Sequence, residues 1–128
     1  MQRVIFRVEN DNGTGMYIGT YGFTAQEYSE SMAWGARRHP NPSEDYGLRS
    51  KWSELREHNT YEQYSFGFSS IEQMRSWVST NEWREELHAH GFMINMYLAD
   101  DSHIGDTQAI FHKGRAVKVG TISLNTLH

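Results

Sequence analysis

The Phe-Gly-Phe-Ser-Ser step at residues 66–70 carries the residue types in this chain best suited to hold a ligand. A strand, a glycine and two serines leading into a helix place hydroxyl and N–H groups at a helix N-terminus. Some nucleotide-binding folds hold a ring or a phosphate at such a point. Ser69 and Ser70 also fit a capping box, because Glu72 and Gln73 follow each of them three residues later. The two serines are therefore candidates both for ligand binding and for helix capping.

Basic and aromatic residues near the N-terminus form a second set of candidates. Arg7 lies in the predicted first strand, where a solvated or salt-bridged side chain and a ligand-binding side chain are the two alternatives. Tyr17 follows the turn signal Asn-Asp-Asn-Gly and could form one wall of a ring-binding cleft, although core packing is the favoured interpretation.

His39 opens a polar loop, His-Pro-Asn-Pro-Ser-Glu-Asp, which ends at Asp45. Each residue before a proline is pushed toward extended backbone, so this loop is stiff. Stiff polar loops on a scaffold commonly carry function, which makes His39 a candidate ligand-binding residue. A proline-braced surface loop is the favoured interpretation.

No metal site or catalytic group is predicted. His88 and His90 lie two positions apart, and side chains with that spacing on a helix point away from each other. The chain has no cysteine, which excludes disulfides, zinc-thiolate sites and thiol nucleophiles. It also lacks a Gly-x-Ser-x-Gly elbow and a distinctive pair of carboxylates, so we assign no catalytic residue.

Length and charge limit the class of protein. With 128 residues the chain is expected to form one globular domain, residues 1–128. The net charge of -4 argues against non-specific binding to nucleic acid or to anionic membranes, because both require a basic surface. Neither a signal peptide nor a membrane-spanning segment is recognisable, so a cytoplasmic location is expected.

The pattern of apolar residues predicts strands at both ends of the chain with helices between them. This order indicates an α+β fold, with an antiparallel or mixed sheet and two to three helices packed on it. The expected strands are 3–8, one near 64–68, 92–98, 108–111 and 116–122. The expected helices are 25–34, 49–58, one that starts near Ile71, and one that starts at Ser79 and ends at Gly91.

The chain resembles a group of small phage and prophage proteins over most of its length. The residues that carry the resemblance are Arg7-Val8-Glu9, the turn Gly13-Thr14-Gly15-Met16-Tyr17, the loop from His39 to Asp45, and Phe66 to Ser70. The resemblance implies a phage protein and carries no function with it.

The chain also shows a distant similarity to the ADP-ribosyltransferase fold, which implies NAD or ADP-ribose as a ligand. On that similarity, Arg7 is the first-strand basic residue, and Ser69 or Ser70 is the residue before the central helix. Gln108 then stands in the late strand, where the family has a glutamate. A glutamine keeps an oxygen acceptor but lacks the charge that stabilises an oxocarbenium-like state, so transferase activity is expected to be weak or lost.

Two hypotheses of function follow. The favoured one is a phage accessory protein that binds and modulates a host protein, for example a component of host defence, without chemistry of its own. Tyrosine and tryptophan dominate interface hot spots, and aromatic residues make up 13% of this chain. The alternative is an NAD- or nucleotide-binding protein, which requires Arg7, Gln108 and one of the two serines to converge on a pocket near Tyr17. The oligomeric state is not predicted.

Overall fold

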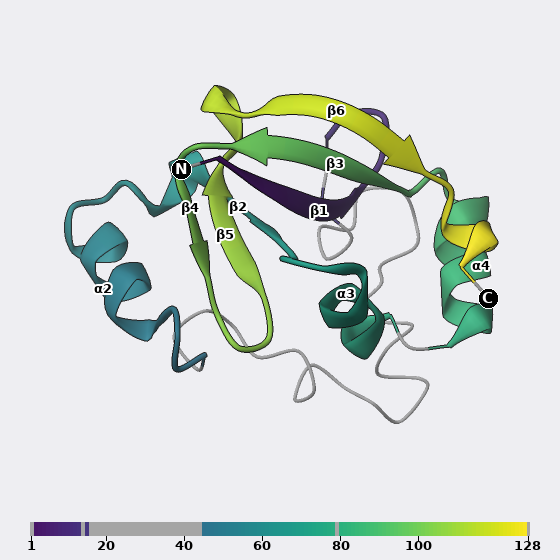
Figure 1. Ribbon diagram of the computed structural model, residues 1–128, viewed down its shortest axis with the longest axis horizontal. Coiled ribbons are helices and arrows are strands. Elements are labelled where there is room, and N and C mark those ends of the chain that lie inside the picture. The colour runs from purple at the N-terminus through teal and green to yellow at the C-terminus, as the bar shows by residue number, and fades with distance from the viewer. Residues whose placement is uncertain (1, 14, 16–44, 79, 128) are drawn as a thin grey trace.

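Two small antiparallel sheets with helices packed beside them form the described part of the chain in this computed structural model (Figure 1). The structure describes residues 2–13, 15, 45–78 and 80–127. The strands are β1 (Arg3–Glu9), β2 (Tyr64–Gly67), β3 (Met93–Ala99), β4 (Ser102–Ile104), β5 (Ala109–His112) and β6 (Val117–Ile122). The helices are α2 (Arg49–Glu57), α3 (Ile71–Trp77) and α4 (Asn81–Ala89), with short 3-10 turns η3 (Tyr61–Gln63), η4 (Lys113–Arg115) and η5 (Leu124–Thr126).

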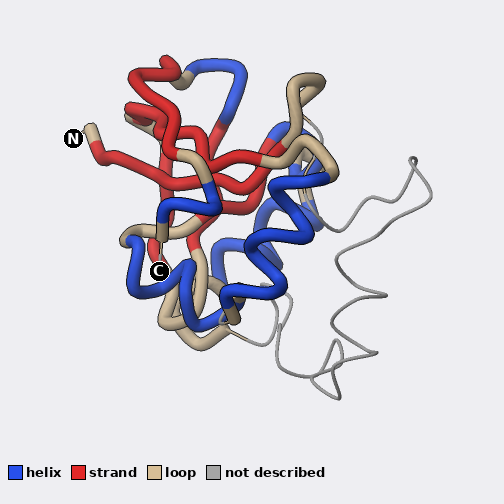
Figure 2. Tube along the Cα trace, turned by 90° about the vertical axis from the view of Figure 1, so that its right-hand side faces the viewer, coloured by secondary structure: helices blue, strands red, loops and turns tan. Residues whose placement is uncertain are grey.

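The strand order is β1-β3-β6 in one sheet and β2-β5-β4 in the other, and neighbouring strands are antiparallel. The predicted α+β class is confirmed, with two three-stranded sheets. Phe6 and Phe68 link the sheets, because their backbones exchange hydrogen bonds of 2.8 and 2.7 Å. Figure 2 shows the strands gathered in one part of the molecule and the longer helices beside them.

Most predicted elements that fall on described residues match the structure within one or two residues. The exceptions have identifiable causes. The helix α4 has Thr80 as its N-cap, where the sequence predicted Ser79, because the Thr80 side chain accepts a hydrogen bond from the Trp83 N–H. β4 was missed, since it is only three residues long. The predicted helix 25–34 lies outside the described residues.

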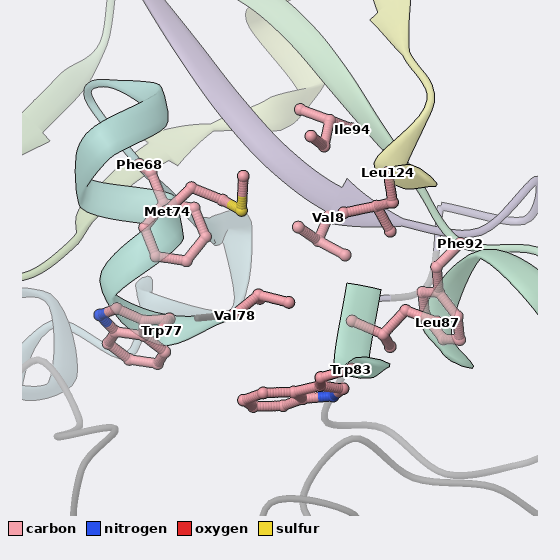
Figure 3. Packing of buried hydrophobic residues seen from close by; sticks show 10 residues of the cluster. All are labelled: Val8, Phe68, Met74, Trp77, Val78, Trp83, Leu87, Phe92, Ile94 and Leu124. Atoms are coloured by element: carbon pink, nitrogen blue, oxygen red, sulfur yellow. The ribbon is translucent and has the colours of Figure 1, made fainter. Parts of the chain in front are cut away.

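The larger hydrophobic cluster fills the space between α3, α4 and one end of the β1-β3-β6 sheet (Figure 3). Its two tryptophans, Trp77 and Trp83, are 6% and 0% exposed. The other buried members are Val8, Phe68, Met74, Val78, Leu87, Phe92, Ile94 and Leu124. The described tryptophans are therefore core residues. In the described part of the chain, no helix has the length and apolar character needed to cross a membrane.

A second cluster lies between the two sheets and contains Ile5 and Phe111. Gly67 ends β2 at this point, directly against β1. A Cβ atom on Gly67 would lie 2.6 Å from Ile5 Cγ2 and 2.9 Å from the backbone oxygen of Phe6. The absence of a side chain at residue 67 is thus what allows the two sheets to approach.

We expect Gly67→Ala to lower the free energy of unfolding by about 2 kcal/mol, because the added methyl group overpacks a contact that includes rigid backbone. Urea denaturation measures the change. Ser65→Ala, on the same strand, is the matched control and should stay within about 0.5 kcal/mol of the wild type. Equal stability of the G67A and S65A variants would contradict the proposed role of Gly67.

Candidate functional site

A buried carboxylate lies at the end of β1. Strand alternation places Ile5, Arg7 and Glu9 on the face of β1 that looks toward the other sheet. Glu9 is only 2% exposed. A buried charge is unfavourable unless it is paired and hydrogen-bonded, so its partners determine what it can do.

Both carboxylate oxygens of Glu9 are occupied by donors. Oε1 accepts hydrogen bonds from Arg7 Nε and Lys113 Nζ, each at 2.7 Å. Oε2 accepts from Asn95 Nδ2 at 2.7 Å and from the Tyr97 hydroxyl. Two donors on each oxygen use the roughly four acceptor positions that a carboxylate offers.

These contacts determine the ionisation of the cluster. Burial alone would raise the pKa of Glu9, but the hydrogen bond from Lys113, the other donors and the nearby guanidinium together lower that pKa from 4.5 to about 2. Burial and the adjacent carboxylate raise the pKa of Tyr97. At neutral pH, Glu9 is therefore ionised and saturated with donors, which makes it unsuited to act as a general base.

An open cleft of about 320 Å³ lies beside this cluster. Its lining is predominantly polar and consists of Glu9, Asn10, Asp11, Asn12, Gly13, Met93, Asn95, Tyr97, Lys113 and Lys118. Lys113 Nζ also bonds the Gly13 oxygen at 3.2 Å and lies 5.7 Å from the centre of the Tyr97 ring. The ammonium group of Lys113 thus ties the turn after β1 to η4.

β6 borders this cleft and is the terminal strand of its sheet (Figure 1). Its Lys118 pairs with Tyr97 across the sheet and lines the cleft. Val117 and Val119 are 62% and 54% exposed. Tyr97 pairs with Lys118 but Met96 pairs with Gly120, so Val119 is an extra residue that forms a bulge in β6. The site thus combines a polar cleft with an exposed, apolar strand edge.

Of the four sequence-predicted residues that the structure describes, only Arg7 belongs to this cluster. The Arg7 guanidinium bonds Glu9, and its Nη1 donates to the Phe66 backbone oxygen at 2.7 Å. Ser70 is the N-cap of α3, where its hydroxyl accepts from the Gln73 N–H at 3.0 Å. The predicted cap at Ser70 is thus confirmed, whereas Ser69, which the sequence paired with Glu72, donates its N–H to Gln73 Oε1 at 2.9 Å.

Gln108 is 2% exposed and immediately precedes β5, in the other sheet from Arg7. The cleft beside Glu9 is lined by residues other than Arg7, Ser69, Ser70 and Gln108. Tyr17 and His39 lie outside the described residues. A ligand-binding role for these six residues stays a prediction.

The sequence analysis missed Glu9, Asn95, Tyr97 and Lys113. One signal could have identified all of them except Lys113, namely polar residues at alternate positions of otherwise apolar strands: Arg7 and Glu9 in β1, Asn95 and Tyr97 in β3. Alternation places each pair on one face, but the strand pairing that joins them is not visible in the sequence. Among the described residues, no group of three or more histidine, aspartate or glutamate side chains could hold a metal ion.

Fold and site together define a small α+β domain with a saturated buried carboxylate and an exposed edge strand beside it. The chain belongs to the phage protein family described as Bacteriophage T4 Y00F protein, whose family model matches residues 1–125. The resemblance to phage proteins is thereby confirmed. Searches of the curated proteins and of the solved structures give no match. The similarity to ADP-ribosyltransferases stays a prediction.

We expect Glu9→Gln to destabilise the protein at pH 7 by about 3 kcal/mol, because it leaves two half-buried cations without their carboxylate. The folded pKa of about 2 lies below the unfolded value of 4.5. The carboxylate therefore contributes stability that is fully present above pH 4.5 and is lost as the pH falls toward 2. Urea unfolding of both proteins between pH 7 and pH 2 measures the difference.

The control for this titration is Asp45, whose backbone and side-chain hydrogen bonds from Thr107 lower its pKa against the opposing effect of burial. In the E9Q variant, acid should still remove the part of the unfolding free energy that comes from ionised Asp45. In the Asp45→Asn variant, acid should still remove the part that comes from ionised Glu9. An E9Q variant with the full wild-type loss would show that Glu9 is not the group that titrates.

Proposed function

We propose that this phage protein is an accessory protein that acts in the host cytoplasm, where it binds and modulates a host protein without chemistry of its own. The family supplies the phage context. We assign the binding surface to the outer edge of β6 and the residues exposed along it.

The observation that carries the proposal is the exposure of two valines on a terminal strand. Val117 and Val119 are each more than half exposed, and β6 pairs with β3 alone among the described strands. Proteins normally protect such edges, because unpaired N–H and C=O groups next to apolar side chains can pair with a strand of another chain. Exposed apolar surface of this kind is typical of a site for a protein partner.

The absence of chemistry is supported by the two buried carboxylates of the described chain. Glu9 has two donors on each oxygen. Asp45, which is 2% exposed, accepts four hydrogen bonds: from the backbone of Gly47, Asp106 and Thr107, and from the Thr107 hydroxyl. Saturated, ionised carboxylates stabilise a fold but lack a free position from which to abstract a proton.

The test is capture from a lysate of the host bacterium, with quantitative mass spectrometry. We expect the wild type to enrich a specific host protein, and we expect Val117→Lys with Val119→Lys to reduce the enrichment at least about tenfold, or 1.4 kcal/mol. Tyr46→Lys is the matched control, since Tyr46 is 81% exposed in the turn before α2 and should leave capture unchanged. Thermal melting verifies that all three proteins are folded.

Two outcomes would contradict the proposal. One is equal enrichment of the host protein by the double valine variant and by the Tyr46→Lys control, which would place the interface elsewhere. The other is a rise of several degrees in the melting temperature with NAD or ADP-ribose, because a ligand at 100 times its dissociation constant adds about 2.7 kcal/mol. That rise would favour the nucleotide-binding alternative.

A further inference from the structure

The chain is acidic, but the segment that leads into β6 is basic. Lys113, Arg115 and Lys118 lie within six residues, and no acidic residue follows Lys113 up to the last residue of the sequence. The net charge of the whole chain is -4. A local excess of positive charge on an acidic protein attracts a partner of the opposite sign to that point.

The three cations of this segment have different partners. Lys113 is paired with Glu9 at 2.7 Å and is part of the fold. Arg115 is 71% exposed, with its Nη1 3.9 Å from Asp101 Oδ2. Lys118 is exposed, and no described side chain forms an ion pair with it. Lys118 is therefore the cation of β6 that is available to a partner.

Lys118 and the neighbouring valine lie on opposite faces of β6. Lys118 pairs with Tyr97 and shares the face of the cleft. Val117 pairs with Leu98, which pairs with Val4 on β1, so these three side chains form a row on the other face. Val4 is 43% exposed, so the apolar row is open to solvent at both of its ends.

From this arrangement we infer that the partner adds an extended acidic segment to the edge of β6 that faces away from β3. The inference rests on the proposed function and names the chemistry of the partner. The backbone of the added strand would bond the outward-facing groups of β6, which no described strand pairs. Its alternate side chains would meet Val117 on one face and Lys118 on the other, so apolar and acidic residues should alternate in it.

Two other occupants fit the same edge less well. A second copy of the chain would bring two basic segments side by side, and like charges on adjacent strands repel. A nucleic acid would use the cations but would leave the two exposed valines without a partner, and the net charge of -4 opposes its approach. An acidic strand would pair with Lys118, cover the exposed valines and bond the backbone of β6.

The probe is a labelled peptide of about ten residues in which glutamate and valine alternate. Fluorescence anisotropy measures its binding to the full chain up to about 1 mM. We expect binding that weakens as salt increases, falls at least about tenfold with Lys118→Glu, and is lost when the peptide backbone is N-methylated. A peptide with lysine for glutamate should bind the K118E variant and not the wild type. Lys51→Glu, on α2, is the matched charge control.

The remaining outcomes overturn the inference. The inference of an acidic strand is wrong if no peptide binds, or if binding depends neither on the charge of the peptide nor on N-methylation of its backbone. The proposed function still stands if capture of the host protein depends on Val117 and Val119. Preferential binding of a duplex DNA would assign the edge to nucleic acid. A dimer in sedimentation that the two valine substitutions dissociate would assign it to a second copy.

Discussion

The position of the Glu9 carboxylate is the constraint on which the β1-β3-β6 sheet and its free edge depend. A buried charge is tolerated only when its partners are in place, so this group fixes each element that supplies a donor. Those donors come from β1 itself, from β3 and from η4, through Arg7, Asn95, Tyr97 and Lys113. Because η4 directly precedes β6, the Lys113–Glu9 pair also determines where β6 begins. The exposed edge is therefore held by a buried interaction.

Asp45 is a second buried carboxylate, and it holds the connection between β4 and β5 of the other sheet against the start of α2. Its oxygens accept hydrogen bonds from the backbone N–H groups of Asp106 and Thr107, in the connection between β4 and β5, and its own backbone oxygen accepts from Leu48 and Arg49 at the start of α2. A Cβ atom on Gly105 would lie 2.5 Å from this carboxylate, so the loop follows it closely. Glu9 thus binds side-chain donors, whereas Asp45 binds mainly backbone donors. In both cases burial raises the pKa of the carboxyl group and the hydrogen-bond donors lower it by more, to below its usual value.

Local signals in the sequence were sufficient for most elements of the fold. The caps of α3 and the glycine after α4 depend on neighbouring residues, and Gly91 has the predicted left-handed backbone, with φ of 86°. The division into two sheets and the Glu9 cluster depend on pairing between distant residues, such as Arg7 with Asn95, which alternation within one strand cannot reveal. The sequence motifs pointed to Ser69, Ser70 and Gln108 as ligand-binding residues. The first two serve the helix cap, and Gln108 stands before β5 rather than inside it.

Under the proposed mode of binding, stability and recognition are divided between two lysines five positions apart. Lys113 has its charge neutralised inside the fold, so a change there alters the placement of η4 and acts on folding and binding together. Lys118 contributes no described ion pair, and its charge protects the edge of β6 from strands that are neutral or basic. The same charge is favourable toward an acidic strand, which is how one residue can oppose aggregation and still permit a specific partner. The bulge beside Val119 adds to this selectivity, because a strand that pairs along the whole edge must accommodate the extra residue.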